Sequence, residues 1–430
     1  MLESIFIVVF LIALFFLIGI NYKAFFIAIL CAMFLENDIF WIKESNFIPF
    51  NIRPIYIISL ASLIYLIPQL VVKINSSFTF LRHHKVLLGY YSYCVFMLIM
   101  APNYNAIEHF GQISIGIFLY FSFIILSKKN DFNTLYQVLL LVGLFQLFLG
   151  FLQVIFGVLT FENIINLESY VQHLDLVPYG RPFGSLVEPD FFGAIATFFT
   201  FIFIGEYLTT RKDIYYFIGL LFVFLLFYSG VRASILGFLF SLILVIFLVK
   251  DRIKVSRIDS IISIYATILL VPIFYSTIQR FAYLFRLDFW SEGFMNPRLL
   301  QMGVSFSQFL ENPIFGNGLN AYRFLGDSYT EAIESWMPDW VISGYDPSIL
   351  TSLLNDTGLI GFGLFGIFIF YYFSHLLIVK NFRNIFIFGA IFSLFISYIF
   401  TNGLPFTFTW ILLAMTELIS NLSNKQLDEI

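Results

Sequence analysis

A succession of long apolar segments is the feature that most constrains what this chain can fold into. About thirteen such runs follow one another, many of them close to the roughly 20 residues that a bilayer-spanning helix needs. Only 12% of the residues are charged, about half the share found in an ordinary soluble domain. The sequence therefore predicts an all-α, polytopic integral membrane protein with about 12–14 transmembrane helices. The runs lie at about 4–20, 24–41, 54–72, 86–101, 110–127, 134–159, 189–207, 213–229, 233–249, 259–277, 349–378, 384–401 and 404–420.

The same pattern excludes several other classes of protein. The apolar runs lack the alternation of a transmembrane β-barrel, and no long polar stretch is available for a soluble catalytic domain. The net charge of −4 has no clustered tail, so nucleic-acid binding has no electrostatic basis. Cys31 and Cys94 both lie inside apolar runs, so neither a disulfide framework nor a thiolate zinc site is expected.

The distribution of basic residues predicts the orientation, because Lys and Arg collect in cytoplasmic loops. Fifteen of the 23 Lys and Arg fall in one alternating set of mostly short loops. This set becomes cytoplasmic if the C-terminal tail, 421–430, is cytoplasmic. The long loops 160–188 and 278–348 and the N-terminus then face outward. The outward set holds Lys43, Arg53, Arg181, Arg232, Arg280, Arg286, Arg298 and Arg323.

The first apolar run resembles a signal peptide in length but not in its flanks. Glu3 stands where a basic start is usual, and Asn21-Tyr22-Lys23 follow without a small-residue cleavage site. We therefore expect residues 4–20 to remain as a span.

Every outward basic residue after Arg53 is an arginine. Chance is one explanation, since only six residues are involved. The functional explanation is that the planar guanidinium binds phosphate through two parallel hydrogen bonds, whereas lysine acts as a point charge. A protein that holds a diphosphate without a metal ion would use arginine.

Two of four notable outward stretches precede or join apolar runs. In the first, Arg181 is followed by Glu188-Pro189-Asp190, which is a typical helix start because proline suits the first turn and an acid suits its positive end. In the second, Arg232 lies in a tight turn between two strongly apolar spans, where burying an ionisable residue is expensive. The alternatives are that both acids merely cap the helix and pair with Arg181, and that Arg232 extends to the interface.

The other two stretches belong to the long loop 278–348. Asn296-Pro297 predicts the start of an amphipathic helix lying along the outer membrane interface, with Arg298 in its first turn and Pro313 after its end. A turn at Gly316-Asn317-Gly318 and then Arg323 follow. The last stretch places Asp346 before the span at 349–378, either as a general base or as a helix cap.

The histidines give little support to other chemistries. Only His173 lies in a candidate active loop, and His83-His84 beside Arg82 and Lys85 are typical of a solvated cytoplasmic loop. With no G-x-S-x-G motif and with scattered histidines, neither a serine hydrolase nor a metal site is expected, and no cofactor is implied.

Taken in order, these stretches resemble the O-antigen ligase and polymerase superfamily of bacterial envelope glycan assembly. The resemblance covers about 140–380, so we divide the chain into N-terminal helices at 1–133, a superfamily-like core at 134–420 and a cytoplasmic tail at 421–430. It is carried by Arg181 to Gly193, Arg232-Ala233-Ser234, the helix from Arg298 to Asn312-Pro313, Gly316-Asn317-Gly318 and Gly358-Leu359-Ile360-Gly361.

The resemblance implies a metal-independent, inverting glycosyltransferase of the bacterial inner membrane, with its active site facing the periplasm. The donor would be an oligosaccharide on undecaprenyl diphosphate, with a lipid-linked glycan as acceptor and a chain-length regulator as a family partner. Arg181, Arg232 and Arg298, with Arg323 further out, would neutralise the departing diphosphate. Glu188 or Asp346 would deprotonate the acceptor hydroxyl.

One departure from the superfamily pattern favours a repeat-unit polymerase (Wzy type) of O-antigen, capsule or a related polysaccharide. The ligases resemble one another in a His-Asn pair where this chain has Asp346-Pro347-Ser348. The alternative is a ligase that passes the glycan to lipid A-core or another acceptor. A lipid-linked oligosaccharide flippase fits less well, because the spans carry little charge within them.

Overall fold

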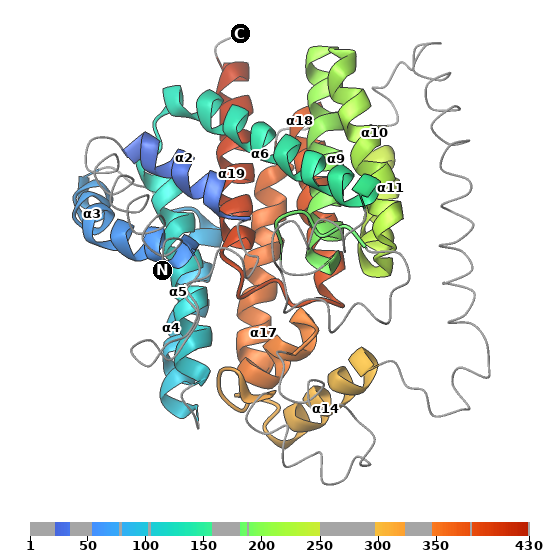
Figure 1. The fold of residues 1–430 in the computed structure, drawn as a ribbon. Helices are drawn as coiled ribbons and strands as arrows, with labels where there is room; N and C mark the ends of the chain where they lie inside the picture. The colour runs from blue at the N-terminus through green and yellow to red at the C-terminus, as the bar shows by residue number, and fades with distance from the viewer. Residues whose placement is uncertain are drawn as a thin grey trace, which may run out of the picture.

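The computed structural model describes residues 22–34, 54–76, 80–101, 105–156, 181–186, 189–249, 297–322, 346–378 and 381–428. This part of the chain holds twelve helices and no strand, so the predicted all-α class is confirmed (Figure 1). The helices are α2 (Tyr22–Ala32), α3 (Pro54–Ser76), α4 (Arg82–Met100), α5 (Asn105–Leu126), α6 (Lys129–Phe156), α9 (Pro189–Thr210), α10 (Asp213–Ser229), α11 (Arg232–Val249), α14 (Pro297–Glu311), α17 (Ile349–Leu376), α18 (Phe382–Tyr398) and α19 (Thr407–Asp428).

Each helix other than α14 coincides with a predicted apolar run. Five are long and apolar enough by length and composition to cross a bilayer, so the prediction of a polytopic membrane protein is confirmed. The predicted spans at 4–20 and 259–277 lie outside the described residues. The five are Ala106–Leu126, Asp131–Phe156, Pro189–Thr210, Arg232–Val249 and Ile349–Leu376.

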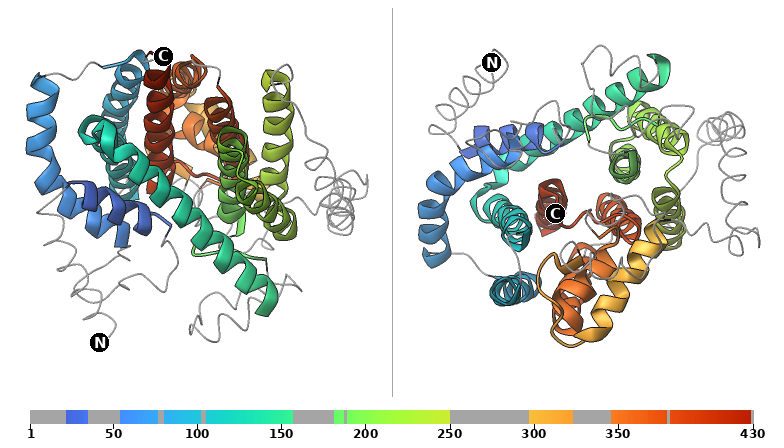
Figure 2. Two further views of the ribbon diagram at one scale, coloured as in Figure 1. Left: turned by 90° about the horizontal axis from the view of Figure 1, so that it is seen from above. Right: turned by 60° about the horizontal axis from the view of Figure 1, so that its bottom comes forward.

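The bundle is organised around α9 and residues 407–420 of α19, whose side chains are buried on almost every side. α9 packs against both α10 and α18, α18 packs against α11, and α19 packs against α5 (Figures 1 and 2). Around them, α4, α6 and α11 expose large apolar side chains such as Ile99, Leu141 and Ile243. An apolar surface of this kind is stable against lipid and unstable against water, which agrees with a membrane location.

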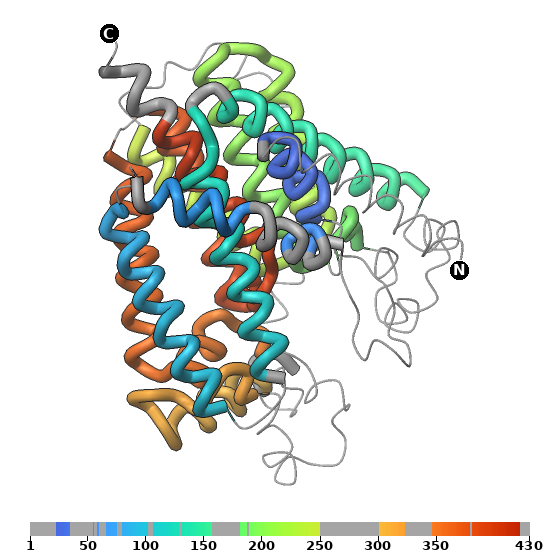
Figure 3. Tube along the Cα trace, turned by 90° about the vertical axis from the view of Figure 1, so that its left-hand side faces the viewer, coloured from blue at the N-terminus to red at the C-terminus, as the bar shows by residue number. Residues whose placement is uncertain are grey.

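α6 crosses the bundle obliquely, with α2 alongside it, in both views of Figure 2. α17 packs against α4 and has α14 across its N-terminal end (Figures 1 and 3). α14 begins at Pro297 and ends at Glu311, two residues before Pro313, so both predicted helix signals are confirmed. The C-terminal α19 continues through most of the segment predicted to be a cytoplasmic tail.

Candidate active site

Arg181 joins two of the predicted stretches. Its Nε donates a hydrogen bond to the carbonyl oxygen of Ser229 at 2.7 Å, and one terminal nitrogen pairs with Asp190 Oδ1 at 2.9 Å. Ser229 is the last residue of α10, and Asp190 lies in the first turn of α9. The other N–H groups of Arg181 form no hydrogen bond with the residues that the structure describes, and a quarter of its side chain is exposed. The guanidinium is therefore fixed at one edge and open at another.

Two glutamines of α6 hold the segment that carries Arg181. Gln153 Oε1 accepts hydrogen bonds from the backbone N–H groups of Phe183 and Gly184, and its Nε2 donates to the Gly184 carbonyl. Gln146, seven residues earlier on the same helix face, bonds both the backbone N–H and the hydroxyl of Ser185. Buried glutamines in an apolar helix are costly unless paired, and here each is paired with the backbone of this segment.

Arg232 begins α11 directly after the turn that Arg181 contacts. The turn closes through Gly230 in the left-handed conformation, with φ of 62°. Gly193 of α9 lies against it, and a Cβ there would come within 2.8 Å of the Val231 side chain. The absence of a side chain at Gly193 therefore lets the first turns of α9 and α11 approach each other. Arg232 is partly exposed at this junction.

The loop after α14 is fastened to α17 at a break in that helix. Gly358 has φ of 60° and ψ of −167°, so the helical ladder is interrupted there. Leu359 N–H then donates to the Pro313 carbonyl and Asn317 N–H donates to the Asn355 carbonyl. A Cβ on Gly316 would lie 2.5 Å from the Gly358 nitrogen, so the two backbones need glycine to approach this closely.

Amide side chains reinforce the same junction. Asn355 Nδ2 donates to Gln308 Oε1 at 2.6 Å, and Asn317 Nδ2 bonds Asn355 Oδ1 at 2.8 Å and the Gln308 carbonyl at 2.7 Å. Asn355 and Gln308 are fully buried. The Gly316-Asn317-Gly318 turn, which alone is a weak signal for phosphate binding, is thus a structural connection between α14 and α17.

Asp346 lies just before α17 and is almost completely buried. Its carboxylate accepts hydrogen bonds from the Ser305 hydroxyl of α14, the Thr351 hydroxyl and the Ser348 backbone N–H. Burial raises the pKa of Asp346 to about 6, although these three hydrogen bonds act in the opposite direction. Ser348, not Asp346, is the N-cap of α17. A carboxylate with a pKa near neutrality can accept a proton from a hydroxyl group, and it also ties α14 to α17.

Asp356 and His109 also meet at this end, and sequence reasoning did not single them out. Asp356 Oδ1 accepts the Ala321 backbone N–H at 3.1 Å, and Oδ2 lies 3.7 Å from His109 Nε2. His109 comes from the first turns of α5, about 250 residues away in the chain. Pairing across such a distance leaves no local sequence signal, although an acid two residues before Gly358 was visible.

The other predicted site residues are only partly placed. Glu188, Arg323 and His173 lie outside the described residues. Arg298 lies in the first turn of α14. In Figures 1 and 2 the N-terminal end of α14 is on the same side of the bundle as the N-terminal end of α11. Of the predicted arginines, the structure brings Arg181 to the turn that precedes Arg232. It shows no contact between these arginines and Asp346 in the described part.

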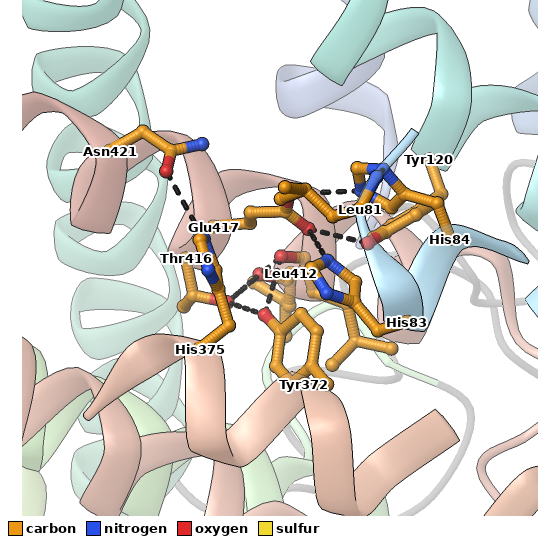
Figure 4. A network of polar contacts seen from close by, with 11 residues as sticks. Leu81, His83, His84, Tyr120, Tyr372, His375, Leu412, Thr416, Glu417 and Asn421 are labelled. Atoms are coloured by element: carbon orange, nitrogen blue, oxygen red, sulfur yellow. Dashed lines mark hydrogen bonds and ion pairs between the residues drawn. The ribbon is translucent and has the colours of Figure 1, made fainter. Parts of the chain in front are cut away.

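A second polar cluster lies within the bundle, and it corrects one prediction. The prediction that His83 and His84 lie in a solvated loop is wrong, because both are buried in the first turn of α4. His83 Nε2 and His84 Nε2 lie 3.1 and 3.0 Å from the two oxygens of Glu417, and Tyr120 donates its hydroxyl to the same carboxylate (Figure 4). Glu417 lies inside the apolar run predicted as a span at 404–420, so the sequence did not single it out as a partner for the histidines.

This cluster has residue types that bind metal ions, with the ligand atoms of His83, His84 and Glu417 within 4.8 Å of one another. The hydrogen bond from Leu81 N–H to His84 Nδ1 at 3.3 Å argues against that use. With Nδ1 accepting, the ring proton lies on Nε2, which then donates to Glu417. A metal-binding histidine shows the reverse arrangement, with a lone pair toward the metal and its other N–H donating. The geometry favours a carboxylate held by three donors.

Comparison with known proteins agrees with the resemblance read from the sequence. Residues 217–366 match the family model Wzy_C, described as O-antigen ligase, so the recognition of that superfamily is confirmed over this region. No curated protein matches the chain. The matched region contains Arg232, Arg298, Arg323 and Asp346, and it ends before α17 does. It points to membrane glycosyl transfer of the ligase and polymerase type in surface polysaccharide synthesis, without separating the two.

Proposed function

We propose that this chain, which carries an O-antigen ligase family region over residues 217–366, polymerises oligosaccharide repeat units on undecaprenyl diphosphate at the outward face of the inner membrane. The acceptor hydroxyl of one lipid-linked unit attacks the anomeric carbon of the donor glycan. The bond from that carbon to the diphosphate oxygen breaks with inversion, and a protein base takes the hydroxyl proton.

The observation that carries this proposal is the setting of Arg181. Hydrogen bonds to Ser229 and Asp190 fix the guanidinium, and two glutamines of α6 hold its backbone neighbours. Its other N–H groups bond none of the described residues and lie beside the turn that leads to Arg232. A prearranged guanidinium stabilises negative charge that develops on a leaving diphosphate without reorganising during the reaction.

Asp346 is the better supported of the two proposed bases. Its pKa of about 6 leaves most of the side chain deprotonated at neutral pH while keeping it basic enough to accept a proton. Gln308 lies on the same helix as Ser305, which contacts Asp346, and its buried Nε2 has no hydrogen-bond partner among the described residues. Glu188 remains the alternative base.

A ligase remains the second candidate, and one observation favours it. The polymerase proposal depends on the absence of a histidine before α17 in the sequence. His109 of α5 approaches the first turns of α17 through Asp356, at 3.7 Å, so a histidine is supplied from another helix. In that case His109 would assist transfer of the glycan to lipid A-core or another acceptor.

The gel pattern of surface glycan in a deletion strain separates the candidates. A polymerase gives a single repeat unit on its acceptor after deletion, whereas a ligase leaves long chains on undecaprenyl diphosphate. Complementation with Arg181→Ala or Arg298→Ala should fail to restore polymer at normal membrane levels of the protein. Lys212→Ala, which removes an exposed cation at the opposite end of α9 and α10, is the matched control and should restore it. An unchanged ladder in the deletion strain would contradict both enzyme proposals.

A further inference from the structure

An apolar groove lies between α3, α4 and α5, on other segments of the chain than those that carry Arg181 and Arg232. Its volume is about 330 Å³, within the range of sites that bind small molecules. Figure 3 faces this side of the molecule. The walls are almost entirely hydrocarbon, and they include Ile74 of α3, Phe80 and Leu88 beside and within α4, and Phe121 and Ile125 of α5.

The length of the groove corresponds to one leaflet of a bilayer. Along α5 the lining runs from Ser114 to Ile125, which at 1.5 Å per residue is about 16 Å. Half of a hydrocarbon core about 30 Å thick is close to this length. At the end of the groove lined by Tyr91 and Ser114, the Tyr91 hydroxyl donates to Ser114 Oγ at 3.1 Å, and Ser114 Oγ donates to the Phe110 carbonyl. The few polar atoms are therefore paired with each other, and the groove offers apolar surface to its occupant.

Cations gather at the other end of the groove. Arg82 and Lys85 are exposed and, with Leu88, occur at every third position of one α4 face. Lys73 adjoins Ile74 at the end of α3, where burial and the nearby Lys128 lower its pKa, and Asp131 offsets part of this effect. All four cations belong to the loops predicted to be cytoplasmic. Because Arg82 and Lys85 are exposed, an anion bound at this end of the groove can contact them.

We propose that the groove binds an anionic glycerophospholipid of the cytoplasmic leaflet, with its phosphate at Lys73, Arg82 and Lys85 and an acyl chain along the apolar walls. Basic pockets between helices on the cytoplasmic side recognise such head groups. The polyprenyl donor is a poorer fit, because its diphosphate would lie with Arg181 at the outward end and its tail is far longer than one leaflet. This site is thus separate from the proposed transfer reaction.

The occupant would also support the buried histidine cluster. Phe80 and Phe121 line the groove on one side and make edge contacts with the His84 ring on the other, with ring centroids 6.4 and 5.8 Å apart. A lipid that fills the groove holds these two rings in place. Because it binds the folded protein, it should raise the melting temperature by an amount that grows with the lipid concentration.

Native mass spectrometry of the full-length protein in detergent tests the proposal, with phosphatidylglycerol and phosphatidylcholine as probes. We expect phosphatidylglycerol to bind at least about tenfold more tightly, and this preference to be lost in the triple variant Lys73→Gln, Arg82→Gln, Lys85→Gln. Leu88→Trp places a large ring in the groove from a position that is 38% exposed, and it should abolish both binding and thermal stabilisation by phosphatidylglycerol.

Two controls distinguish the groove from general surface charge. Arg211→Gln with Lys212→Gln removes cations predicted to face the same leaflet, at a helix connection distant from the groove in the chain. Leu239→Trp places the same ring on α11, at a position that is 40% exposed. Both controls should keep the preference. An equal loss of binding in the controls, equal affinity for the two lipids, or displacement of phosphatidylglycerol by undecaprenyl phosphate would overturn the proposal.

Discussion

Replacing Glu417 by glutamine tests whether the buried carboxylate is a main contributor to the stability of the bundle. His83, His84 and Tyr120 all direct donors at its two oxygens, and all four side chains are buried (Figure 4). Glutamine keeps one acceptor oxygen but turns an NH₂ group toward a ring N–H that also donates. One charge-assisted hydrogen bond is lost outright and the others become neutral.

The expected loss in the free energy of unfolding is about 3–5 kcal/mol, because one hydrogen bond to a charged acceptor is lost and the other two become weaker. Each hydrogen bond to a charged group contributes about 1.5–3 kcal/mol, so Tyr120→Phe alone should cost about that amount. In the Glu417→Gln background the Tyr120→Phe change should cost clearly less, since the charged acceptor is already gone.

Denaturant unfolding in mild detergent, followed by tryptophan fluorescence, measures these differences. Glu311→Gln, at an exposed position at the end of α14, is the control and should change the free energy by no more than about 0.5 kcal/mol. A loss below about 1 kcal/mol for Glu417→Gln would refute the reasoning. Full additivity with Tyr120→Phe would also refute it, because the two side chains would then not share one network.

Three further predictions concern the proposed active site. Transfer activity, measured as product formation, should rise with pH through about 6, and Asp346→Asn should lose this dependence. Burial raises the pKa of Asp346 in the folded protein above 3.8, so its contribution to stability should fall as the pH rises from about 4 to 6. Arg181→Lys should retain little activity in a gel assay of polymer, because lysine cannot bond Ser229, Asp190 and phosphate together, and full activity would show that charge alone suffices. Gln153→Leu leaves two buried backbone N–H groups without their acceptor, so it should cost about 2–4 kcal/mol of unfolding free energy and lower activity, and an unchanged stability would argue against the bracing role of α6.

Much of the fold could be predicted from the sequence, because membrane helices reveal themselves locally. Apolar runs marked the helices, and Pro297 and Pro313 bounded α14 as expected. The turn before α11 and the turn at Gly316-Asn317-Gly318 were predicted, but the reason for glycine at position 316 is the close approach of Gly358.

Contacts between distant segments could not be predicted in this way. His83 and His84 beside two cations have the composition of a solvated loop, and only the position of Glu417, more than 330 residues later, explains why they are buried. The same holds for His109 and Asp356. For Arg181 the sequence left open whether it binds diphosphate or pairs with a helix-start acid; the structure shows the pair with Asp190, and the contact with the α10–α11 turn is a tertiary feature.

Reconstitution of the purified protein with a single lipid-linked substrate tests the proposed activity most directly. Incubation in liposomes with undecaprenyl diphosphate carrying one repeat unit, followed by gel electrophoresis of the glycan, should yield a ladder of two, three and more units. The ladder should be absent with Arg181→Ala and persist with Lys212→Ala. Consumption of donor only when lipid A-core is added, with no ladder in its absence, would contradict the polymerase and identify a ligase.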